Sequence, residues 1–116
     1  MKAGKADNEG DKIQEPISNI DRLIHEPSRL TVMAHLYVVE NADFLFLVRQ
    51  TGMTWGNLSV HISKLEAAGY LEVKKEFLGK KPHTVVSLTK KGRKAFEAYR
   101  QGMKEVLDGT KGSTRQ

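Results

Sequence analysis

The spacing of apolar residues changes at Gly69, and this change constrains the fold more than any other feature of the sequence. Before Gly69, apolar residues recur every three or four positions, which predicts amphipathic helices. From Tyr70 to Phe77 the pattern is that of a strand with moderate alternation, and His83–Leu88 is rich in β-branched residues. The intervening Leu78–Pro82 contains a glycine and predicts a turn. We therefore expect a helical domain that carries one β-hairpin.

Four helices are predicted before the hairpin and one after it. Their limits rest on N-cap residues, prolines and glycines at the ends of the periodic segments. The expected helices are Ser18 to about His25, Pro27 to about Glu40, Phe44 to Thr51, a helix capped by Thr54 through Ala68, and a helix capped by Thr89 to about Leu107. A two-stranded hairpin is not stable alone, so it must pack on the helices. The predicted fold class is mainly α with a small β-hairpin (α+β), with a three-helix core, a two-stranded hairpin and a long C-terminal helix.

The two ends of the chain differ in composition from the region between them. Residues 1–15 contain Ile13 as their single branched apolar residue, and Gly109–Gln116 is similarly polar. Such segments cannot bury enough surface to offset the entropy of ordering, so we expect a disordered N-terminal arm and a flexible tail. The folded domain is predicted to span residues 16–108, without an internal repeat or linker.

Missing residue types and motifs exclude several functions. Without cysteine the chain cannot form a disulfide, a thiolate zinc site or an iron–sulfur cluster. The four histidines fall on four predicted elements, and the HExxH, GxGxxG and Walker motifs are absent, so we expect no metal, no cofactor and no enzymatic activity. No signal peptide or membrane-length apolar segment is visible, so we expect a cytoplasmic protein without a membrane partner.

Positive charge is concentrated in and after the predicted hairpin. The net charge of +5 suits an anionic partner. Between residues 74 and 94 only Glu76 opposes the basic side chains of Lys74, Lys75, Lys80, Lys81, Lys90, Lys91, Arg93 and Lys94. These residues would suit a track of DNA phosphates, or else an edge strand that lysines keep soluble. The predicted DNA contacts on the hairpin are Lys74, Lys75, Lys80, Lys81 and His83.

The helix predicted from Thr54 to Ala68 has the features of a helix that enters the major groove of DNA. Its start is capped, and Leu58, Ile62 and Leu65 form a single stripe that would face inward. The start and the opposite side of the helix supply the candidate DNA contacts Thr54, Trp55, Asn57, Ser59, Val60, His61, Ser63 and Lys64.

Three of these residues have side chains suited to particular base edges. Asn57 could pair with adenine, Val60 could contact a thymine methyl group, and Lys64 could reach guanine or a phosphate. The alternative is an ordinary amphipathic surface helix. In that case Trp55 would be a core anchor and His61 a solvated or packing histidine.

The run from Thr51 to Leu71 resembles the winged helix DNA-binding domains of the broad MarR/ArsR-like group. It combines an asparagine, a Leu-Ser pair, a histidine with an apolar neighbour and a Leu-Glu-x-Ala-Gly-Tyr sequence. Upstream, His25–Leu30 looks like the start of the family's second helix. Downstream, Gly79–Thr84 and Ser87–Arg93 look like its wing and the entry to its last helix. Relatives often carry a basic or amide residue at the position of Val60.

The resemblance covers about residues 18 to 108 and implies a winged helix-turn-helix fold. It further implies a transcriptional regulator, with repression as the expected mode, that binds operator DNA as a homodimer joined through the terminal helices. Relatives often respond to small molecules, so an effector of unidentified chemistry is an expected partner. The alternative is a winged helix module that docks an acidic protein partner, because fold does not fix function.

Overall fold

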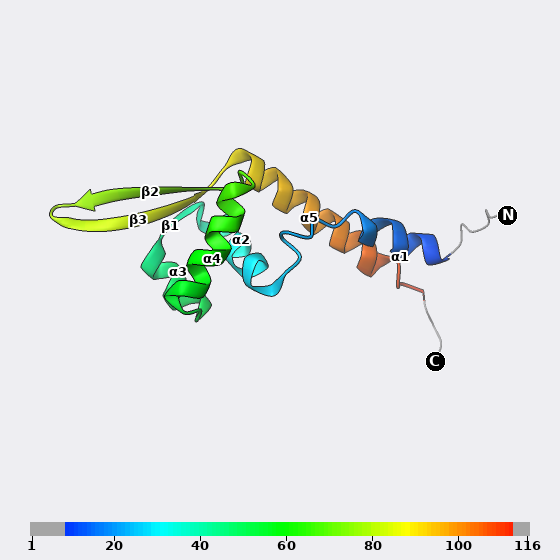
Figure 1. The fold of residues 1–116 in the computed structure, drawn as a ribbon. Helices are drawn as coiled ribbons and strands as arrows, with labels where there is room; N and C mark the ends of the chain where they lie inside the picture. The colour runs from blue at the N-terminus through cyan, green and yellow to red at the C-terminus, as the bar shows by residue number, and fades with distance from the viewer. Residues whose placement is uncertain (1–8, 113–116) are drawn as a thin grey trace. The chain divides into compact units, whose positions relative to one another are not determined.

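The computed structural model describes residues 9–112, which form five helices and three strands (Figure 1). In chain order the elements are α1 (Glu9–Ser18), α2 (Pro27–Val39), β1 (Asn41–Asp43), α3 (Phe44–Thr51), α4 (Trp55–Ala67), β2 (Leu71–Leu78), β3 (Lys81–Leu88) and α5 (Lys90–Asp108). The chain forms two compact units, one of residues 22–96 and one of the described parts of residues 1–21 and 97–116. The predicted fold class, mainly α with a small β-hairpin, is confirmed.

The helices of the larger unit begin and end where local side chains satisfy the backbone. Glu26 caps α2 by accepting the Arg29 N–H at 2.8 Å, and Asp43 caps α3 by accepting the Leu45 N–H at 2.7 Å. Gly52 ends α3 with a φ of 72°, in the left-handed region that favours glycine. The core of the unit consists of fully buried apolar side chains, the largest being Ile24, Met33, Leu36, Leu47, Leu58, Leu65, Val32 and Val86.

The sheet has three strands in the order β1-β3-β2, all antiparallel, rather than the two strands predicted. The additional strand β1 pairs its buried Ala42 with Val86 of β3. Strand β1 was not predicted, because three residues are too few to show the alternation of apolar and polar side chains that marks a strand. Its pairing partner also lies more than 40 residues further along the chain.

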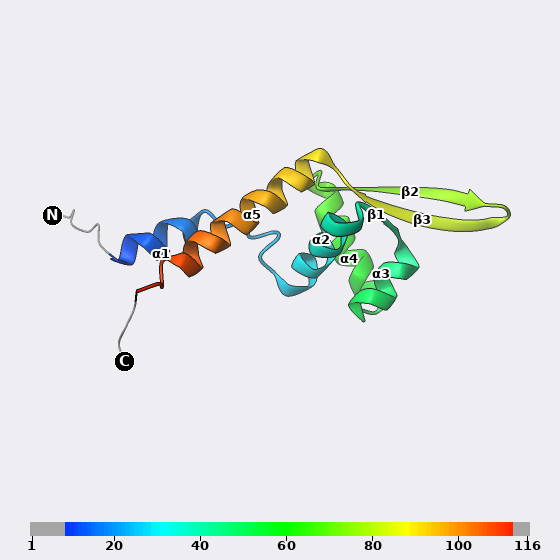
Figure 2. The same ribbon diagram turned by 180° about the vertical axis from the view of Figure 1, so that it is seen from behind.

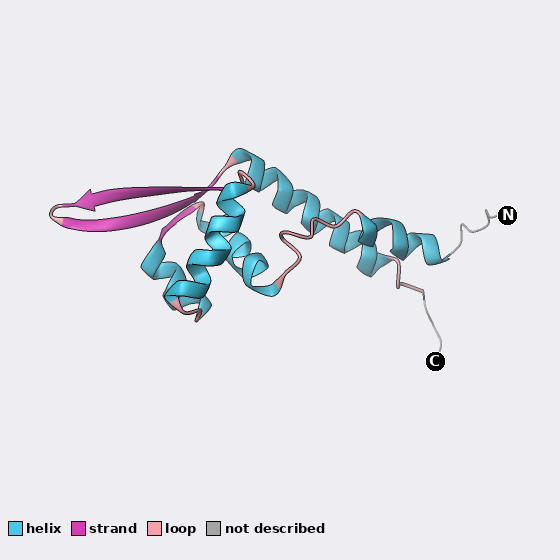
Figure 3. Cartoon of the chain, in the orientation of Figure 1, coloured by secondary structure: helices cyan, strands magenta, loops and turns pink. Residues whose placement is uncertain are grey.

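The β2–β3 hairpin is buried at its base and exposed over its outer part. Leu71 and Val86 are buried, whereas every residue from Lys74 to Pro82 is exposed. In both the rear view and the view coloured by secondary structure, the outer hairpin extends past α2, α3 and α4 (Figure 2 and Figure 3). Strand β2 is shifted by one residue from its prediction, β3 begins two residues earlier, and the turn is tighter, because the ladder continues to Leu78 opposite Lys81.

A close contact joins the end of α4 to the start of α5. The Thr89 hydroxyl donates to the Gly69 carbonyl at 2.6 Å and accepts the Gly92 N–H at 2.9 Å, so Thr89 caps α5 as predicted. A Cβ atom on Gly92 would lie 2.2 Å from the Tyr70 carbonyl oxygen, so only glycine fits there. This contact positions the base of the hairpin between the two helices.

The N-terminal segment departs from its prediction. Because α1 covers Glu9–Ser18, the expected disorder is wrong for residues 9–15, and turns replace the helix expected from Ser18 to His25. Ser18 ends α1 instead of capping the next helix, since its hydroxyl donates to the Glu15 carbonyl at 2.9 Å.

Contacts with the C-terminal segment explain why α1 forms although its composition predicts disorder. Within the smaller unit, a Cβ atom on Gly109 would lie 3.0 Å from Cγ1 of Ile13, so these two segments are in direct contact. In both ribbon views α1 lies beside the C-terminal part of α5 (Figure 1 and Figure 2). Composition does not report such long-range packing. Residues 1–8 of the predicted arm and 113–116 of the predicted tail lie outside the described residues.

Candidate nucleic-acid interface

Helix α4 presents one buried and one exposed face, as predicted. Thr54 caps it by accepting the Asn57 N–H at 3.1 Å. Leu58, Ile62 and Leu65 are at most 3% exposed, and they anchor the helix in the core of the larger unit. On the outer side the predicted contacts that lie exposed are Thr54, Trp55, Asn57, Ser59, Val60, Ser63 and Lys64. The helix therefore offers solvent a row of hydrogen-bonding groups with one apolar residue, Val60, among them.

Trp55 lies at the first position of α4 and is not a core anchor. It remains 57% exposed, with its ring centroid 4.4 Å from that of Phe44, the first residue of α3. The buried Phe44 thus supports one side of the indole, and the rest of the ring remains accessible. A fixed, exposed aromatic surface marks the N-terminal end of the helix.

His61 departs from the exposed face on which the sequence placed it. Its side chain is 19% exposed, and its Nδ1 lies 3.3 Å from the Arg29 guanidinium and 3.9 Å from the Glu26 carboxylate. Burial acts to raise the pKa of Glu26. The backbone N–H groups of Arg29 and Ser28, with the nearby positive charges, outweigh it, and the pKa is lowered. His61 therefore ties α4 to the start of α2, and Arg29 faces this cluster.

The outer hairpin carries four exposed lysines around a tight turn. These residues are Lys74, Lys75, Lys80 and Lys81. The turn depends on Gly79, whose φ of 64° lies in the left-handed region. Glu72 approaches Lys74 at 3.9 Å, but both side chains are more than half exposed, so this pair neutralises little of the charge. The hairpin is thus a positively charged projection, as predicted.

The basic residues that follow the hairpin are partly committed to contacts within the larger unit. The Arg93 guanidinium lies 3.5 Å from the Glu40 carboxylate and 4.8 Å from the centroid of the Tyr37 ring. The Lys91 ammonium lies 5.9 Å from the centroid of Tyr70. Of the eight predicted charges, Arg93 is therefore engaged by an acidic residue, whereas the four hairpin lysines and Lys90, Lys91 and Lys94 remain exposed.

His83 is also held by an acidic residue. Its Nδ1 lies 2.7 Å from Oδ2 of Asp43, the residue that caps α3. This hydrogen bond from His83, together with the backbone N–H of Leu45, lowers the pKa of Asp43. The contact fixes β3 against the start of α3. Nothing local in the sequence indicates this contact, because the two residues lie forty positions apart.

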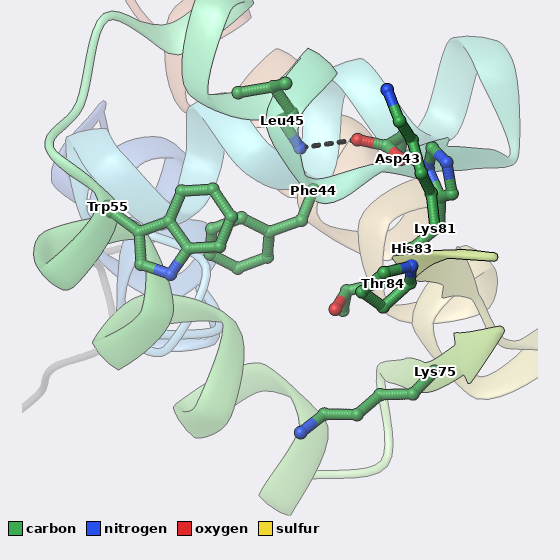
Figure 4. A pocket seen from close by; sticks show the side chains of 9 residues that line it. Asp43, Phe44, Leu45, Trp55, Lys75, Lys81, His83 and Thr84 are labelled. Carbon is green, nitrogen blue, oxygen red and sulfur yellow. Dashed lines mark hydrogen bonds and ion pairs between the residues drawn. The ribbon is translucent and has the colours of Figure 1, made fainter. Parts of the chain in front are cut away.

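A groove of about 520 Å³ separates the start of α4 from the hairpin. Trp55 and Phe44 line one side, while Lys75, Lys81 and Thr84 line the other (Figure 4). The groove shows that the exposed end of α4 and the lysines of the hairpin border the same surface. Phe44 and Thr84 were not among the predicted site residues, because only the fold brings them to this groove.

Among the described residues, no group of three or more His, Cys, Asp or Glu side chains could hold a metal ion. None of the helices in that part of the chain combines the length and the apolar composition of a membrane span.

Comparisons with known proteins were made on both sequence and structure. The sequence profile of the winged helix DNA-binding domain matches residues 28–107. An uncharacterized protein of Methanocaldococcus jannaschii is 35% identical over 78 residues, which cover 67% of this chain and 85% of the relative. A transcriptional regulator homologue from Pyrococcus horikoshii superposes with a TM-score of 0.77 at 28% identity, over 87% of this chain and 98% of that chain.

A more distant structure shares the fold alone. BpsR of Bordetella bronchiseptica, whose DNA binding is regulated by 6-hydroxynicotinic acid, superposes with a TM-score of 0.59 at 19% identity. The match covers 76% of this chain and 66% of BpsR.

Proposed function

Because the chain belongs to the winged helix DNA-binding domain family, we propose that it regulates transcription by binding operator DNA as a homodimer. The family consists of DNA-binding regulators rather than enzymes. In the proposed complex α4 enters the major groove, and the hairpin contacts the phosphate backbone. The mode of regulation that we propose is repression.

One observation carries this proposal: the exposed end of α4 and the lysines of the hairpin border the same groove. A helix supplies base contacts only if its polar face is accessible, and Asn57 and Lys64 are exposed. Phosphate contacts supply affinity, and Lys75 and Lys81 lie across the groove from Trp55. A DNA duplex laid on this surface would meet both kinds of contact.

The individual residues receive different roles in the proposed complex. Asn57, Val60 and Lys64 contact base edges from the outer face of α4. Thr54, Trp55, Ser59 and Ser63 contact the DNA from the start and the flanks of the helix, and Lys74, Lys75, Lys80 and Lys81 contact phosphates. His61 and His83 act as positioning residues, since both are engaged by acidic groups of the protein.

The terminal helices are the proposed dimer interface. In the smaller unit, Ile13 of α1 is 38% exposed and Leu107 of α5 is 61% exposed. A second copy that covered these side chains would remove their apolar surface from water. Two copies related by a twofold axis would place their α4 helices about 34 Å apart, which is one turn of DNA.

The proposed effector is a small organic molecule that changes DNA affinity. BpsR, which shares the fold, responds to 6-hydroxynicotinic acid. Titration of that acid into the protein–DNA complex would test this part of the proposal, since release of the DNA would support it.

A salt titration against selected duplex DNA tests the proposed function. Four hairpin lysines from each of two chains would release about eight counterions, so the logarithm of affinity should fall with that of salt at a slope of about −7. The nuclease footprint should show two half-sites, and sedimentation should give a dimer that Leu107→Asp dissociates. A DNA affinity that does not change with salt concentration would contradict the proposal. Tight binding of an acidic protein in the absence of DNA would favour the docking module instead.

A further inference from the structure

The tip of the β2–β3 hairpin is apolar, although the hairpin around it is charged. Phe77 is 70% exposed and Leu78 is 63% exposed, directly before the Gly79–Lys80 turn. Lysines alone would suffice to keep an edge strand soluble or to contact phosphates. Neither of those roles accounts for an exposed phenylalanine at the tip of a projecting element.

The register shows which way Phe77 points. Side chains two residues apart on a strand lie on the same face, so Phe77 shares its face with Lys75. Their cross-strand partners are Pro82 for Phe77 and Thr84 for Lys75. Nearer the base, the same face carries the paired Val73 and Val86, and Val86 is fully buried in the core. Phe77 therefore lies on the face of the hairpin that packs on the core at its base, further out towards the tip.

The length of the exposed strand fits the spacing of DNA grooves. From Lys74 to Gly79 in the turn, the exposed chain advances five steps of about 3.3 Å, or about 17 Å. Half of the DNA helical repeat of about 34 Å is also about 17 Å, which separates a major groove from the next minor groove. With α4 in the major groove, the tip of the hairpin would reach the adjacent minor groove.

We propose that Phe77 is an apolar wedge that enters the minor groove, partly unstacks one base step and bends the DNA. This inference rests on the proposed function, and it assigns DNA deformation to one side chain. Apolar side chains inserted in this way kink a duplex by about 20–90° towards the major groove. The neighbouring Lys80 and Lys81 lie beside the turn, where they hold the phosphates of the two strands. The positive charge around Phe77 identifies a polyanionic duplex, rather than a second copy of this basic chain, as its partner.

The test uses a duplex recovered from a random library by selection with the full chain. Donor and acceptor dyes at its two ends report bending, and 2-aminopurine at successive steps reports unstacking. The wild-type protein should shorten the end-to-end distance and raise the fluorescence at one step of each half-site. Phe77→Ala should abolish both signals and weaken binding by roughly tenfold, with an unchanged salt slope.

The matched control is Phe46→Ala, which truncates another partly exposed phenylalanine of the same unit. Phe46 is 39% exposed on α3 and does not line the groove beside Trp55. This variant should bend DNA like the wild type although it loses some stability through the covered part of Phe46, whereas Phe77→Ala should keep the wild-type unfolding temperature.

Three results would overturn the wedge. One is a straight duplex in the wild-type complex, and another is full bending by Phe77→Ala; both leave the proposed DNA binding standing. The third is a lower oligomeric state in Phe77→Ala, which would show that a second copy covers the tip. If the wild type bound no duplex at any salt concentration, the proposed function would fail together with the wedge.

Discussion

Helix α4 and the outer hairpin border one surface, but the protein supports them in opposite ways. Each turn of α4 is anchored by a buried side chain, as Leu58, Ile62 and Leu65 show. Between Lys74 and Pro82, by contrast, every residue of the hairpin is exposed. An element with few buried apolar contacts has low local stability and adapts to its partner. The comparison indicates that α4 is preorganised, as the proposed base contacts require, whereas the hairpin can adapt, as the proposed phosphate contacts allow.

Both elements are nevertheless attached to the rest of the unit in the same way, through a histidine beside a carboxylate. His61 of α4 lies beside Glu26, and His83 at the inner part of β3 is bonded to Asp43. Both acidic residues are helix caps, of α2 and α3 respectively. Each carboxylate therefore serves a helix N-terminus and a histidine of an element that borders the proposed DNA surface. In the sequence the two histidines are candidate DNA contacts; in the fold each lies beside an acidic helix cap, which supports the proposed positioning role.

The largest contrast between the two elements should be in stability. Leu65 is fully buried and Leu78 is 63% exposed, so replacing each with alanine compares a buried leucine with an exposed one. Leu65→Ala should lower the free energy of unfolding by about 2–5 kcal/mol, through lost burial and the cavity left behind. Leu78→Ala should change it by less than about 0.5 kcal/mol. Urea denaturation measures both, and equal losses would show that the outer hairpin is packed rather than exposed.

The next contrast is in sequence preference. Asn57 is exposed on α4, two residues after Trp55 begins the helix. Asn57→Ala should remove about 1–3 kcal/mol of discrimination at one base pair in each half-site, while affinity for random DNA changes little. Competition between the selected site and its single-base variants measures this. Ser59→Ala, on the flank of the same helix, is the matched control, and a uniform loss for all sequences would assign Asn57 to the backbone.

The hairpin lysines should contribute equally to the binding of every DNA sequence. Lys80 and Lys81 are exposed at the turn, so Lys80→Ala combined with Lys81→Ala should cost about 1 kcal/mol per lysine on every duplex. Because the double substitution removes four of the eight lysines of the proposed dimer, the salt slope should become shallower by about 4. Arg22→Ala, which removes an exposed charge outside the hairpin and the terminal helices, is the control. A change in base preference would mean that the two elements are not separate in role.

The same contrast explains which parts of the fold could be predicted. The limits of α4 follow from signals within the segment itself, namely the Thr54 cap, the stripe through Leu58 and the glycine at Gly69. The missed features all depend on residues far away in the chain. Strand β1 exists through pairing with β3, and α1 has its Ile13 beside Gly109. No local pattern contains those partners.

The candidate site divides in the same way. The exposed residues of α4 and the hairpin lysines could be identified, because periodicity and charge density are visible in the sequence. The pairing of His61 with the Glu26 cluster and of His83 with Asp43 could not, since each joins residues more than thirty positions apart. From the sequence alone, a histidine on the polar face of an element is expected to be accessible. Only the fold shows which carboxylate lies beside it.

The smallest expected effect concerns the attachment of the hairpin and depends on pH. The hydrogen bond from His83, followed by that from the Leu45 N–H, lowers the pKa of Asp43 in the folded protein. In the unfolded chain an aspartate titrates near a pH of about 3.9. Above that pH Asp43 is ionised in both states, and its contacts contribute fully to stability. As the pH falls below about 3.9 and through the lower folded pKa, the carboxylate takes up a proton and the contribution is lost.

Asp43→Asn separates this ionisation from the helix cap, because asparagine also caps helices well. The variant should be less stable than the wild type at neutral pH by under about 1 kcal/mol, since both side chains of the pair are about one third exposed and solvent screens them. Urea midpoints from neutral to acid pH should converge below a pH of about 4, where the wild type has lost the Asp43 contribution. Glu72→Gln, which neutralises an exposed carboxylate on the hairpin itself, should run parallel to the wild type over the whole range. If instead the gap between Asp43→Asn and wild type widened towards acid pH, His83 would not be stabilising the ionised carboxylate, and the inner hairpin would be held by its apolar contacts alone.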